Sequence, residues 1–376
     1  MKKMSSILGL KIGLMMFCAM AALATPVFAE DAKPATPVVS ADDIKKALGM
    51  SIYLQSGYTY NGNASAGQVN DLRAFDTKAN SFGLDLLELV FAKDPAAGVI
   101  GYKVKISAGD TARIINAAGL GASTPDSIDI TEAYLSYTAP VGKGLRFDAG
   151  KMATFVGAEV MEAIDNPNYS RSFLFTWAEP LTHTGVKASY TFNDKINAAL
   201  FVVNGWDNMN DNNTGKSIGL SVNLTPNDKI SGYVNYLTGP EETNNTRDNR
   251  SLLDLIATIT PIKPLSFILN YDNGQEQHLS ASGGTAEWSG VSAIAKYDFS
   301  ETYSLAVRGE YFDDKDGVRT LTVQKLTEVT ITPTIKLAGG LVLMPEYRHD
   351  ISNKQSFDSG TKKSQDTIAL GAMYRW

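Results

Sequence analysis

The sequence predicts a transmembrane antiparallel β-barrel of about sixteen strands. Many segments about ten residues long alternate apolar and polar residues, a pattern typical of strands with one face against apolar surroundings. The connections between these segments alternate between short and long. Beyond the N-terminus, no uninterrupted apolar run reaches the roughly 18 residues that a membrane-spanning helix needs.

The composition excludes several classes of protein. The chain has 376 residues, of which 44% are hydrophobic and 20% charged, and its formal net charge is −6. The apolar content is too high and the net charge too low for a disordered chain. A single cysteine cannot build a disulfide scaffold, and the acidic balance argues against nucleic acid as a partner.

The first 29 residues are predicted to be a secretory signal peptide. Basic residues precede an apolar run and a V-x-A cleavage site, namely Lys2, Lys3 and Lys11, residues 12–23, and Val27 to Ala29. A membrane anchor is the alternative, but the apolar run is too short to span a bilayer and ends at Pro26. Cleavage would leave 31 Lys and Arg against 40 Asp and Glu, a net charge of −9, and no cysteine.

The alternating segments define the individual strands. In the last segment, Ile368, Leu370 and Tyr374 lie on one face and Thr367 and Arg375 on the other. The same pattern predicts sixteen strands, near residues 48–60, 80–93, 97–109, 126–139, 144–154, 183–193, 195–205, 216–225, 229–238, 250–260, 264–273, 287–298, 302–312, 325–335, 341–350 and 364–376. We therefore expect a barrel at 48–376, preceded by a short periplasmic segment at 30–47 with a helical turn near 41–49.

A soluble β-sandwich would also alternate apolar and polar residues, but the connections distinguish the two folds. Short connections such as 193–194 and 226–228 alternate with longer polar ones such as 206–215 and 351–363. Short periplasmic turns and long outer loops are typical of an outer-membrane barrel, whereas a sandwich has no reason to separate its loops by length. The barrel should close, because an open sheet edge in lipid would leave backbone polar groups unpaired.

Aromatic residues stand near the predicted strand ends. Trp206 and Trp288 lie at long-loop ends, and Tyr297, Tyr303 and Trp376 at short-turn ends, so we expect two interfacial girdles. The terminal segment with Tyr374 and Trp376 resembles the C-terminal aromatic signature that the outer-membrane assembly machinery recognises.

The longest connection, residues 155–182, is the third of the long loops. It contains a group of polar residues and then three large apolar ones, in order Glu159, Glu162, Asp165, Tyr169, Arg171, Phe173, Phe175 and Trp177. Packing inside the barrel would shelter the apolar side chains and narrow the lumen, so we expect this loop to form a pore constriction. The alternative is an outer loop that packs on its neighbours or on another subunit.

The alternation of inward and outward positions along each strand predicts a basic inner wall. Six basic residues are expected to face the lumen, namely Lys103, Lys105, Arg146, Lys187, Arg308 and Arg348. Inward Asp148, Glu310 and Glu346 would partly neutralise them. Acidic loop residues opposite a basic wall would create a transverse field at the narrowest point, where pores discriminate between ions.

Several motifs resemble the β-barrel porin-2 (OmpL-like) family of Gram-negative bacteria. They are DITEAY at 129–134, AGK at 149–151, GAE at 157–159, NYSRS at 168–172, THTGV at 182–186 and VNGWD at 203–207. The resemblance implies an outer-membrane channel without a defined catalytic site. The third loop matches the position of the constriction loop in general porins, and similar sixteen-stranded porins imply a homotrimer. Unlike the loop of phosphate-selective porins, this loop is not rich in lysine or arginine.

Enzymatic and metal-binding alternatives have little support in the sequence. A barrel hydrolase could pair His183 with Ser170 or Ser172, which lie near one loop. Residues 206–213 could offer oxygen ligands to Ca²⁺, but they lack the calcium-loop spacing and a closing Glu. We expect no cofactor and no metal.

The pattern as a whole favours a channel. About sixteen strands leave a water-filled lumen, so the predicted function is passive diffusion of small hydrophilic solutes or ions across the outer membrane. A channel selective for an anion, a sugar or another small solute is the alternative, and a barrel enzyme or an adhesin is a more distant one. The expected partners are outer-membrane lipid, the solutes, the assembly machinery and further copies of the chain.

Overall fold

The computed structural model describes residues 40–63, 68–96, 98–116, 128–279 and 282–376. The predicted signal peptide at 1–29 and residues 30–39 lie outside this part of the chain. Within it, helix α2 (Ala41–Leu48) occupies the position expected for a helical turn. None of the helices in the described ranges is long and apolar enough to cross a membrane.

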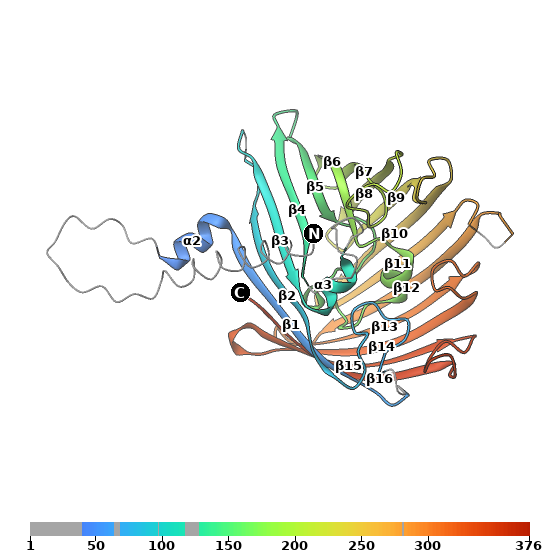
Figure 1. Cartoon of the computed structure of the whole chain (residues 1–376). Helices are drawn as coiled ribbons and strands as arrows, with labels where there is room; N and C mark the ends of the chain where they lie inside the picture. Colours follow the sequence, from blue (N-terminus) through green and yellow to red (C-terminus); the bar gives the residue numbers. More distant parts are fainter. Residues whose placement is uncertain (1–39, 64–67, 97, 117–127, 280–281) are drawn as a thin grey trace, which may run out of the picture. The chain divides into compact units, whose positions relative to one another are not determined.

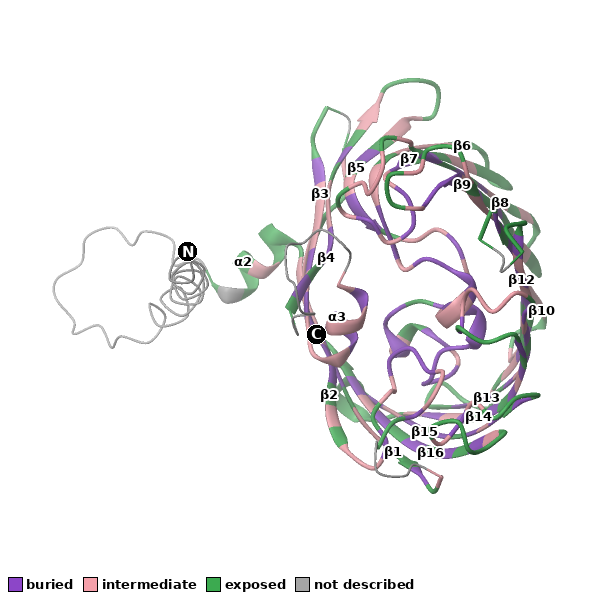
Figure 2. Cartoon of the chain, turned by 45° about the vertical axis from the view of Figure 1, so that its right-hand side comes forward, coloured by how far each residue is buried: buried purple, intermediate pink, exposed green. Residues whose placement is uncertain are grey.

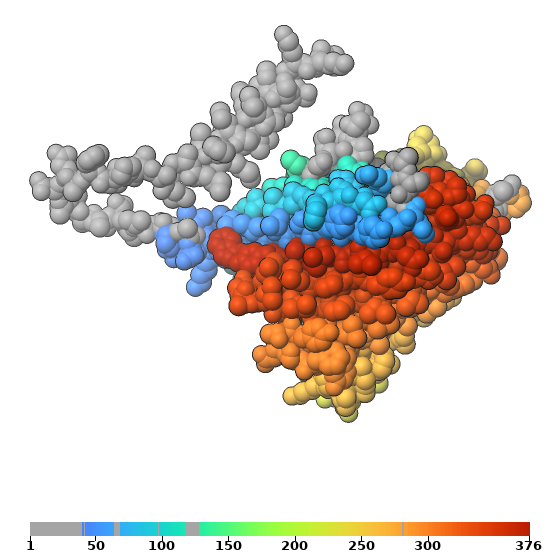
Figure 3. Space-filling model, turned by 90° about the horizontal axis from the view of Figure 1, so that it is seen from below, coloured from blue at the N-terminus to red at the C-terminus, as the bar shows by residue number. Residues whose placement is uncertain are grey.

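Sixteen antiparallel strands form a closed barrel (Figure 1). Each strand pairs with its neighbours in the chain, and the first pairs with the last from Tyr53 opposite Arg375 to Asn61 opposite Thr367. Figure 3 shows this seam, where the blue surface of the first strand lies beside the red surface of the last. The strands are β1 (Met50–Asn61), β2 (Phe82–Lys93), β3 (Gly101–Ala108), β4 (Ile128–Ala139), β5 (Leu145–Ala153), β6 (Thr182–Asn193), β7 (Ile196–Val203), β8 (Ser217–Asn227), β9 (Ile230–Pro240), β10 (Asn249–Ile262), β11 (Leu265–Glu276), β12 (Ala286–Asp298), β13 (Tyr303–Asp314), β14 (Gln324–Lys336), β15 (Leu341–Ser352) and β16 (Ser364–Arg375).

The strand number and the closure confirm the sequence prediction, and so does the direction of the two faces. In β16, Ile368 and Leu370 are exposed on the outside, whereas Thr367 and Ala369 point inward and are buried. The outer face is therefore apolar and the inner face largely polar, as a barrel in lipid requires.

The connections separate by length into the two ends of the barrel. The short ones are 94–100, 140–144, 194–195, 228–229, 263–264, 299–302 and 337–340. The last of these includes the turn η3 (Ala338–Gly340). The long ones are 62–81, 109–127, 154–181, 204–216, 241–248, 277–285, 315–323 and 353–363. We call these ends the short-turn end and the long-loop end. Helix α3 (Asp110–Ile115) belongs to the second long loop.

The prediction of an outer aromatic girdle at Trp206 and Trp288 is wrong. Both side chains are buried inside the barrel and pack edge to face, with ring centroids 6.3 Å apart. Trp288 occupies an inward position of β12, and Trp206 lies beyond the end of β7, so strand parity does not direct either ring toward lipid. At the short-turn end, Tyr297, Tyr303 and Trp376 are exposed as expected.

The third long loop, residues 154–181, lies within the ring of strands, where Figure 2 shows largely buried chain segments. We call it L3; it contains the helical turns η1 (Ala163–Asp165) and η2 (Leu174–Ala178). Phe173 and Leu174 of L3 belong to one apolar cluster with Trp288 and Phe312 of the wall. Tyr169 belongs to a second cluster on the side of β1 and β15. The hydrophobic core of this barrel is therefore the contact between L3 and the wall.

Candidate pore and constriction loop

Arg308 of β13 holds both halves of L3 against the wall. Its guanidinium is fully buried and donates to Glu159 Oε1 at 2.8 Å and to the backbone oxygen of Ser170 at 2.8 Å. On the wall side, it donates to Glu328 Oε1 at 2.6 Å. A planar guanidinium can bind a carboxylate and a carbonyl at once, which suits this position between wall and loop.

Arg348 of β15 makes a second attachment of the same kind. It donates to Asp350 Oδ1 at 2.7 Å and to the backbone oxygen of Arg171 at 2.5 Å, and it stacks over the ring of Phe173. Arg73, which comes from the first long loop, also binds Asp350, at 2.7 Å. The sequence prediction missed Arg73, because nothing in the pattern of loop 62–81 shows that it turns into the barrel.

Carboxylates of the wall bind the backbone of L3 directly. Glu346 accepts the N–H groups of Tyr169 and Ser170 at 2.8 and 3.1 Å. Glu310 accepts those of Phe173 and Leu174, both at 2.6 Å. Buried backbone N–H groups need such partners, so these inward carboxylates satisfy L3 where it has no strand beside it.

Tyr169 and Arg171, predicted constriction residues, are both buried in this contact. The Tyr169 hydroxyl donates to Asp85 Oδ2 at 2.7 Å. Gly371 of β16 makes room for its ring, because an added Cβ there would lie 2.4 Å from it. Arg171 donates to the backbone oxygens of Val160 and Met161 at 2.8 and 2.5 Å, so it folds L3 upon itself.

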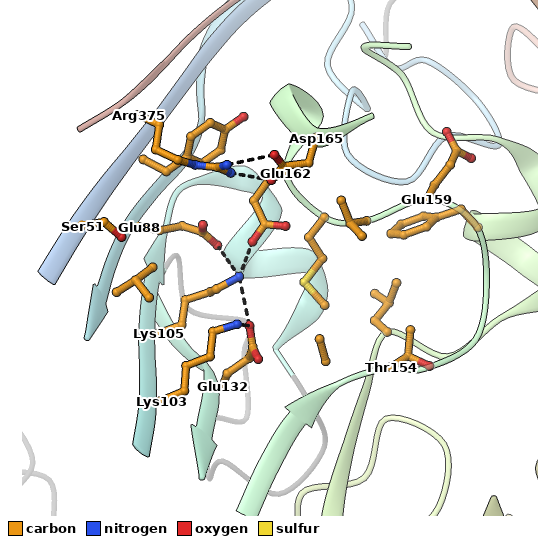
Figure 4. Close-up of a pocket in the computed structure, with 17 residues that line it drawn as sticks. Ser51, Glu88, Lys103, Lys105, Glu132, Thr154, Glu159, Glu162, Asp165 and Arg375 are labelled. Carbon is orange, nitrogen blue, oxygen red and sulfur yellow. Dashed lines mark hydrogen bonds and ion pairs between the residues drawn. The ribbon is translucent and has the colours of Figure 1, made fainter. Parts of the chain in front are cut away.

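A cavity of about 450 Å³ lies between the first half of L3 and the opposite wall (Figure 4). Glu159, Glu162 and Asp165 line it from L3, and Lys103 and Lys105 line it from β3. A second space of about 130 Å³, lined by residues of β4 to β7 that include Lys187, shares several of the same residues. Open volume therefore lies on the side of β1 to β7.

Lys105 is the centre of a charge cluster at this cavity. Its ammonium lies 3.0 Å from Glu132 and 3.7 Å from Glu88, and it also forms an ion pair with Glu162 of L3 (Figure 4). Burial disfavours ionisation of Glu162, but Lys105 outweighs this and holds the pKa of that carboxyl below its usual value. The acidic loop and the basic wall meet here in direct contact.

The other basic residues of the open side stand above buried carboxylates. Arg146 and Lys187 both lie 2.8 Å from Asp148; their side chains are 32% and 28% exposed, and that of Asp148 is 1% exposed. Lys103 pairs with Glu132 at 2.8 Å, with exposures of 30% and 5%. Lys103 and Lys187 line the two spaces and are more exposed than their partners, although Glu132 lines both spaces as well. Arg146 also pairs with the exposed Asp94 of the connection 94–100.

Asp165 binds Arg375 of β16, with Nη1 to Oδ1 at 2.8 Å. The sequence prediction did not include Arg375, although its position on the inner face of the last strand was a signal for it. Lys105 with Glu162 and Arg375 with Asp165 thus tie the first half of L3 to β3 and β16.

The residues of the proposed hydrolase do not come together. His183 is buried and contacts Thr154 Oγ1 at 3.1 Å and the backbone oxygen of Gly205 at 3.0 Å. The Ser170 hydroxyl lies with Arg308 and Arg348, and the Ser172 hydroxyl accepts the N–H of Phe175. In the described part of the chain, no group of three His, Cys, Asp or Glu side chains could hold a metal ion.

Comparison with known proteins assigns the family. Residues 47–376 match the family described as "Putative beta-barrel porin-2, OmpL-like". The chain belongs to this family. It is an outer-membrane β-barrel of Gram-negative bacteria and a channel for small solutes. No curated protein matches its sequence.

Solved structures of porins share the fold at low sequence identity. The OmpF of Salmonella typhi, in complex with daunomycin, has a TM-score of 0.62 at 10% identity and covers 87% of this chain and 97% of its own. An anion-selective porin from Comamonas acidovorans has a TM-score of 0.60 at 10% identity, and the match covers 87% of this chain and 98% of that porin. The outer-membrane channel DcaP of Acinetobacter baumannii has a TM-score of 0.59 at 10% identity, and the match covers 87% of this chain and 96% of DcaP.

Proposed function

We propose that this porin is an open channel for passive diffusion, with its water-filled route on the side of β1 to β7. The observation that carries the proposal is the cavity of about 450 Å³ that L3 and the wall line together. On the opposite side, Arg308 and Arg348 bind the backbone of L3 and hold it against the wall. L3 therefore narrows the lumen to one side of the barrel.

The solutes are small and hydrophilic, with a preference for anions over cations. Lys103 and Lys187, which line the two spaces, have side chains about one-third exposed. Acidic residues line the main cavity too, but the side chains of Glu88, Glu132 and Glu162 are 2%, 5% and 11% exposed. The more exposed Asp165 is paired with Arg375. The buried carboxylates reduce the field but do not cancel it, since the nearer charge acts over the shorter distance. The preference should be weak, and a strongly selective anion channel is the second candidate.

The chain acts as a channel and not as an enzyme, and it assembles as a homotrimer. The separation of His183 from Ser170 supports the first point. An OmpT of Vibrio cholerae, 12% identical over 87% of this chain and with a TM-score of 0.57, is described in a trimer form, which supports the second. The exposed aromatic residues Tyr374 and Trp376 at the end of β16 would serve the assembly machinery.

Reconstitution in planar bilayers tests the open channel. We expect stable conductance steps, a reversal potential in a KCl gradient that shows a weak anion preference, and only weak block by neutral sugars. Saturable block by one class of anion would favour the selective channel. Absence of conductance from correctly folded protein would contradict the proposal.

A charge-reversed wall tests the selectivity. Changing Lys103, Lys105 and Arg146 together to Glu should move the reversal potential toward cation preference, because it replaces three positive charges of the inner wall by negative ones. Lys229→Glu, in a turn between β8 and β9, is the matched control and should leave ion preference unchanged. An unchanged reversal potential in the triple variant would contradict the assignment of these residues.

A further inference from the structure

Three carboxyl groups meet where the end of L3 contacts β10 and β11. Glu179 comes from L3, Asp254 from β10 and Asp272 from β11, and their exposed fractions are 4%, 0% and 0%. None of the three forms an ion pair with a lysine, arginine or histidine in the described part of the chain. Buried carboxylates without a counter-charge are costly, so this cluster needs another source of compensation.

Hydrogen bonds satisfy only one of the three groups. Asp254 accepts the N–H of Gly157 at 2.9 Å and side-chain donors from Asn235 and Asn270 at 2.7 and 2.8 Å. In contrast, both oxygens of Asp272 and the Oε2 atom of Glu179 are buried and accept no hydrogen bond. Asp272 lies directly opposite Asp254 in the pairing of β10 with β11, and Glu179 adjoins Gly157, whose N–H binds Asp254. Two carboxyl groups can bond only if one of them carries a proton.

No other group nearby supplies the missing positive charge. The other titratable groups that act on Glu179 include Glu159 of L3 and Glu310 of β13, which are also acidic. Arg308 is engaged with Glu159 and Glu328. Arg319, from the loop 315–323, donates to the backbone oxygen of Trp177 at 2.5 Å and forms no ion pair with the three carboxyls of the described chain. The described residues form no group able to hold a metal ion. Protons are therefore the compensation that the geometry allows.

We propose that Glu179, Asp254 and Asp272 form a proton-binding site that latches L3 to the barrel wall and thereby regulates the pore. This inference rests on the proposed open channel. With a proton present, a carboxyl of the cluster donates its O–H to its neighbour. When the proton leaves to solvent, the two carboxyl groups that shared it are both negatively charged beside the third. Their repulsion drives the end of L3 from the wall toward the open cavity.

The direction of the pH dependence follows from the burial of Glu179. Burial raises the pKa of its carboxyl well above the usual range, and the charge of Asp254 raises this pKa further. Since the attached loop binds the proton more tightly than the released loop, the attachment is strongest at acidic pH. It weakens as the pH rises through the raised pKa of Glu179.

The two ends of L3 meet at this latch. Gly157, at φ +91°, lies so close to Glu179 that an added Cβ would be 1.8 Å from Oε2. Its N–H binds Asp254, and the next N–H, from Ala158, binds Asn270 at 2.7 Å. Loss of the proton would therefore loosen the beginning and the end of the loop together.

Single-channel recording of the full-length porin tests the latch. We expect brief closures of the wild-type channel to become more frequent from pH 5 to pH 9, by up to roughly tenfold per pH unit below the pKa, because the deprotonated fraction rises by that factor. The double variant Glu179→Gln/Asp272→Asn replaces both groups by neutral amides that can donate, and its closures should be independent of pH. Glu287→Gln, an exposed residue outside the lumen paired with Lys315, should retain the wild-type dependence.

The outcomes separate the latch from the channel. A folded porin that conducts with the same closure frequency at all pH values would overturn the latch and leave the open channel intact, whereas no conductance at any pH would overturn the open channel. If chelation of divalent cations at pH 6 reproduces the closures seen at pH 9, the cluster holds a metal ion and the proton latch is wrong. Should the double variant fail to fold, hydrogen exchange at the Gly157 and Ala158 amides of the wild type gives the same test. Protection that does not fall as pH rises, after correction for intrinsic exchange, would contradict the latch.

Discussion

The inner wall of this porin uses basic residues in two ways on its two sides. On the side of β13 to β15, Arg308 and Arg348 are fully buried and donate to backbone oxygens of L3. On the side of β3 to β6, Lys103 and Lys187 bind only carboxylates of the wall and remain about one-third exposed to the cavity. One side is a structural contact, and the other is the surface that a solute meets.

The chemistry of the two side chains suits this division. A guanidinium presents a rigid fork of donors that can join a carboxylate and a backbone oxygen, whereas an ammonium is a strongly hydrated point charge. The comparison teaches that an inward-facing position on a strand does not by itself make a basic residue part of a pore. What covers the residue decides whether it acts on the solute or on the fold.

The largest expected effect comes from the removal of a buried arginine. Arg308→Met should destabilise the barrel by about 3–5 kcal/mol, because Glu159 loses its cation and Glu328 keeps only Arg348. Lys103→Met, the counterpart on the open side, should cost about 0–1 kcal/mol. Urea unfolding of the porin in vesicles measures both, and equal losses would remove the distinction between the two sides.

A smaller loss of stability is expected from Gly157→Ala. The positive φ of +91° and the contact of an added Cβ with Glu179 both disfavour a side chain there, which should cost about 1–3 kcal/mol. Gly309→Ala is the control, because an added Cβ at that position meets nothing within 4 Å. The same unfolding assay applies, and a neutral Gly157→Ala would mean that L3 is not held closely at this point.

Lys105 stands between the two classes, since it faces the cavity and also binds Glu162 of L3. Lys105→Met leaves three carboxylates without this cation, so we expect a shift of the reversal potential toward cations together with a stability loss of about 1–3 kcal/mol. A change in the reversal potential alone would mean that Lys105 acts only on the solute. A change in the stability alone would mean that it acts only on the fold.

The smallest effect is expected from neutral substitutions on the open side. Lys103→Gln/Lys187→Gln should weaken the anion preference and change the stability by less than about 1 kcal/mol, because Glu132 keeps Lys105 and Asp148 keeps Arg146. Bilayer reversal potentials and urea unfolding are measured on the same preparation. A large loss of stability with unchanged ion preference would show that these lysines belong to the fold.

The strands, their order and their faces could be predicted from the sequence, because apolar residues that face lipid alternate along each strand with polar residues that face the lumen. That contrast does not distinguish open lumen from a surface covered by L3, since both are polar. For this reason Arg308 and Lys103 looked equivalent, and Trp288 was placed in a girdle although it packs under L3. Contacts between distant segments, such as Arg73 with Asp350 and Asp272 with Asp254, depend on the closed fold and have no local signal.

Cysteine modification tests the position of the open route most directly. The chain has one cysteine, Cys18, within the predicted signal peptide, so single cysteines can be placed in an unreactive background. Lys103→Cys lies at the cavity, whereas Thr332→Cys lies buried beneath L3, where Thr332 Oγ1 contacts Asn168 at 2.7 Å. A water-soluble thiol reagent added to the open channel should lower the conductance of Lys103→Cys and leave Thr332→Cys unchanged. Block at Thr332→Cys with none at Lys103→Cys would contradict an open route along β1 to β7.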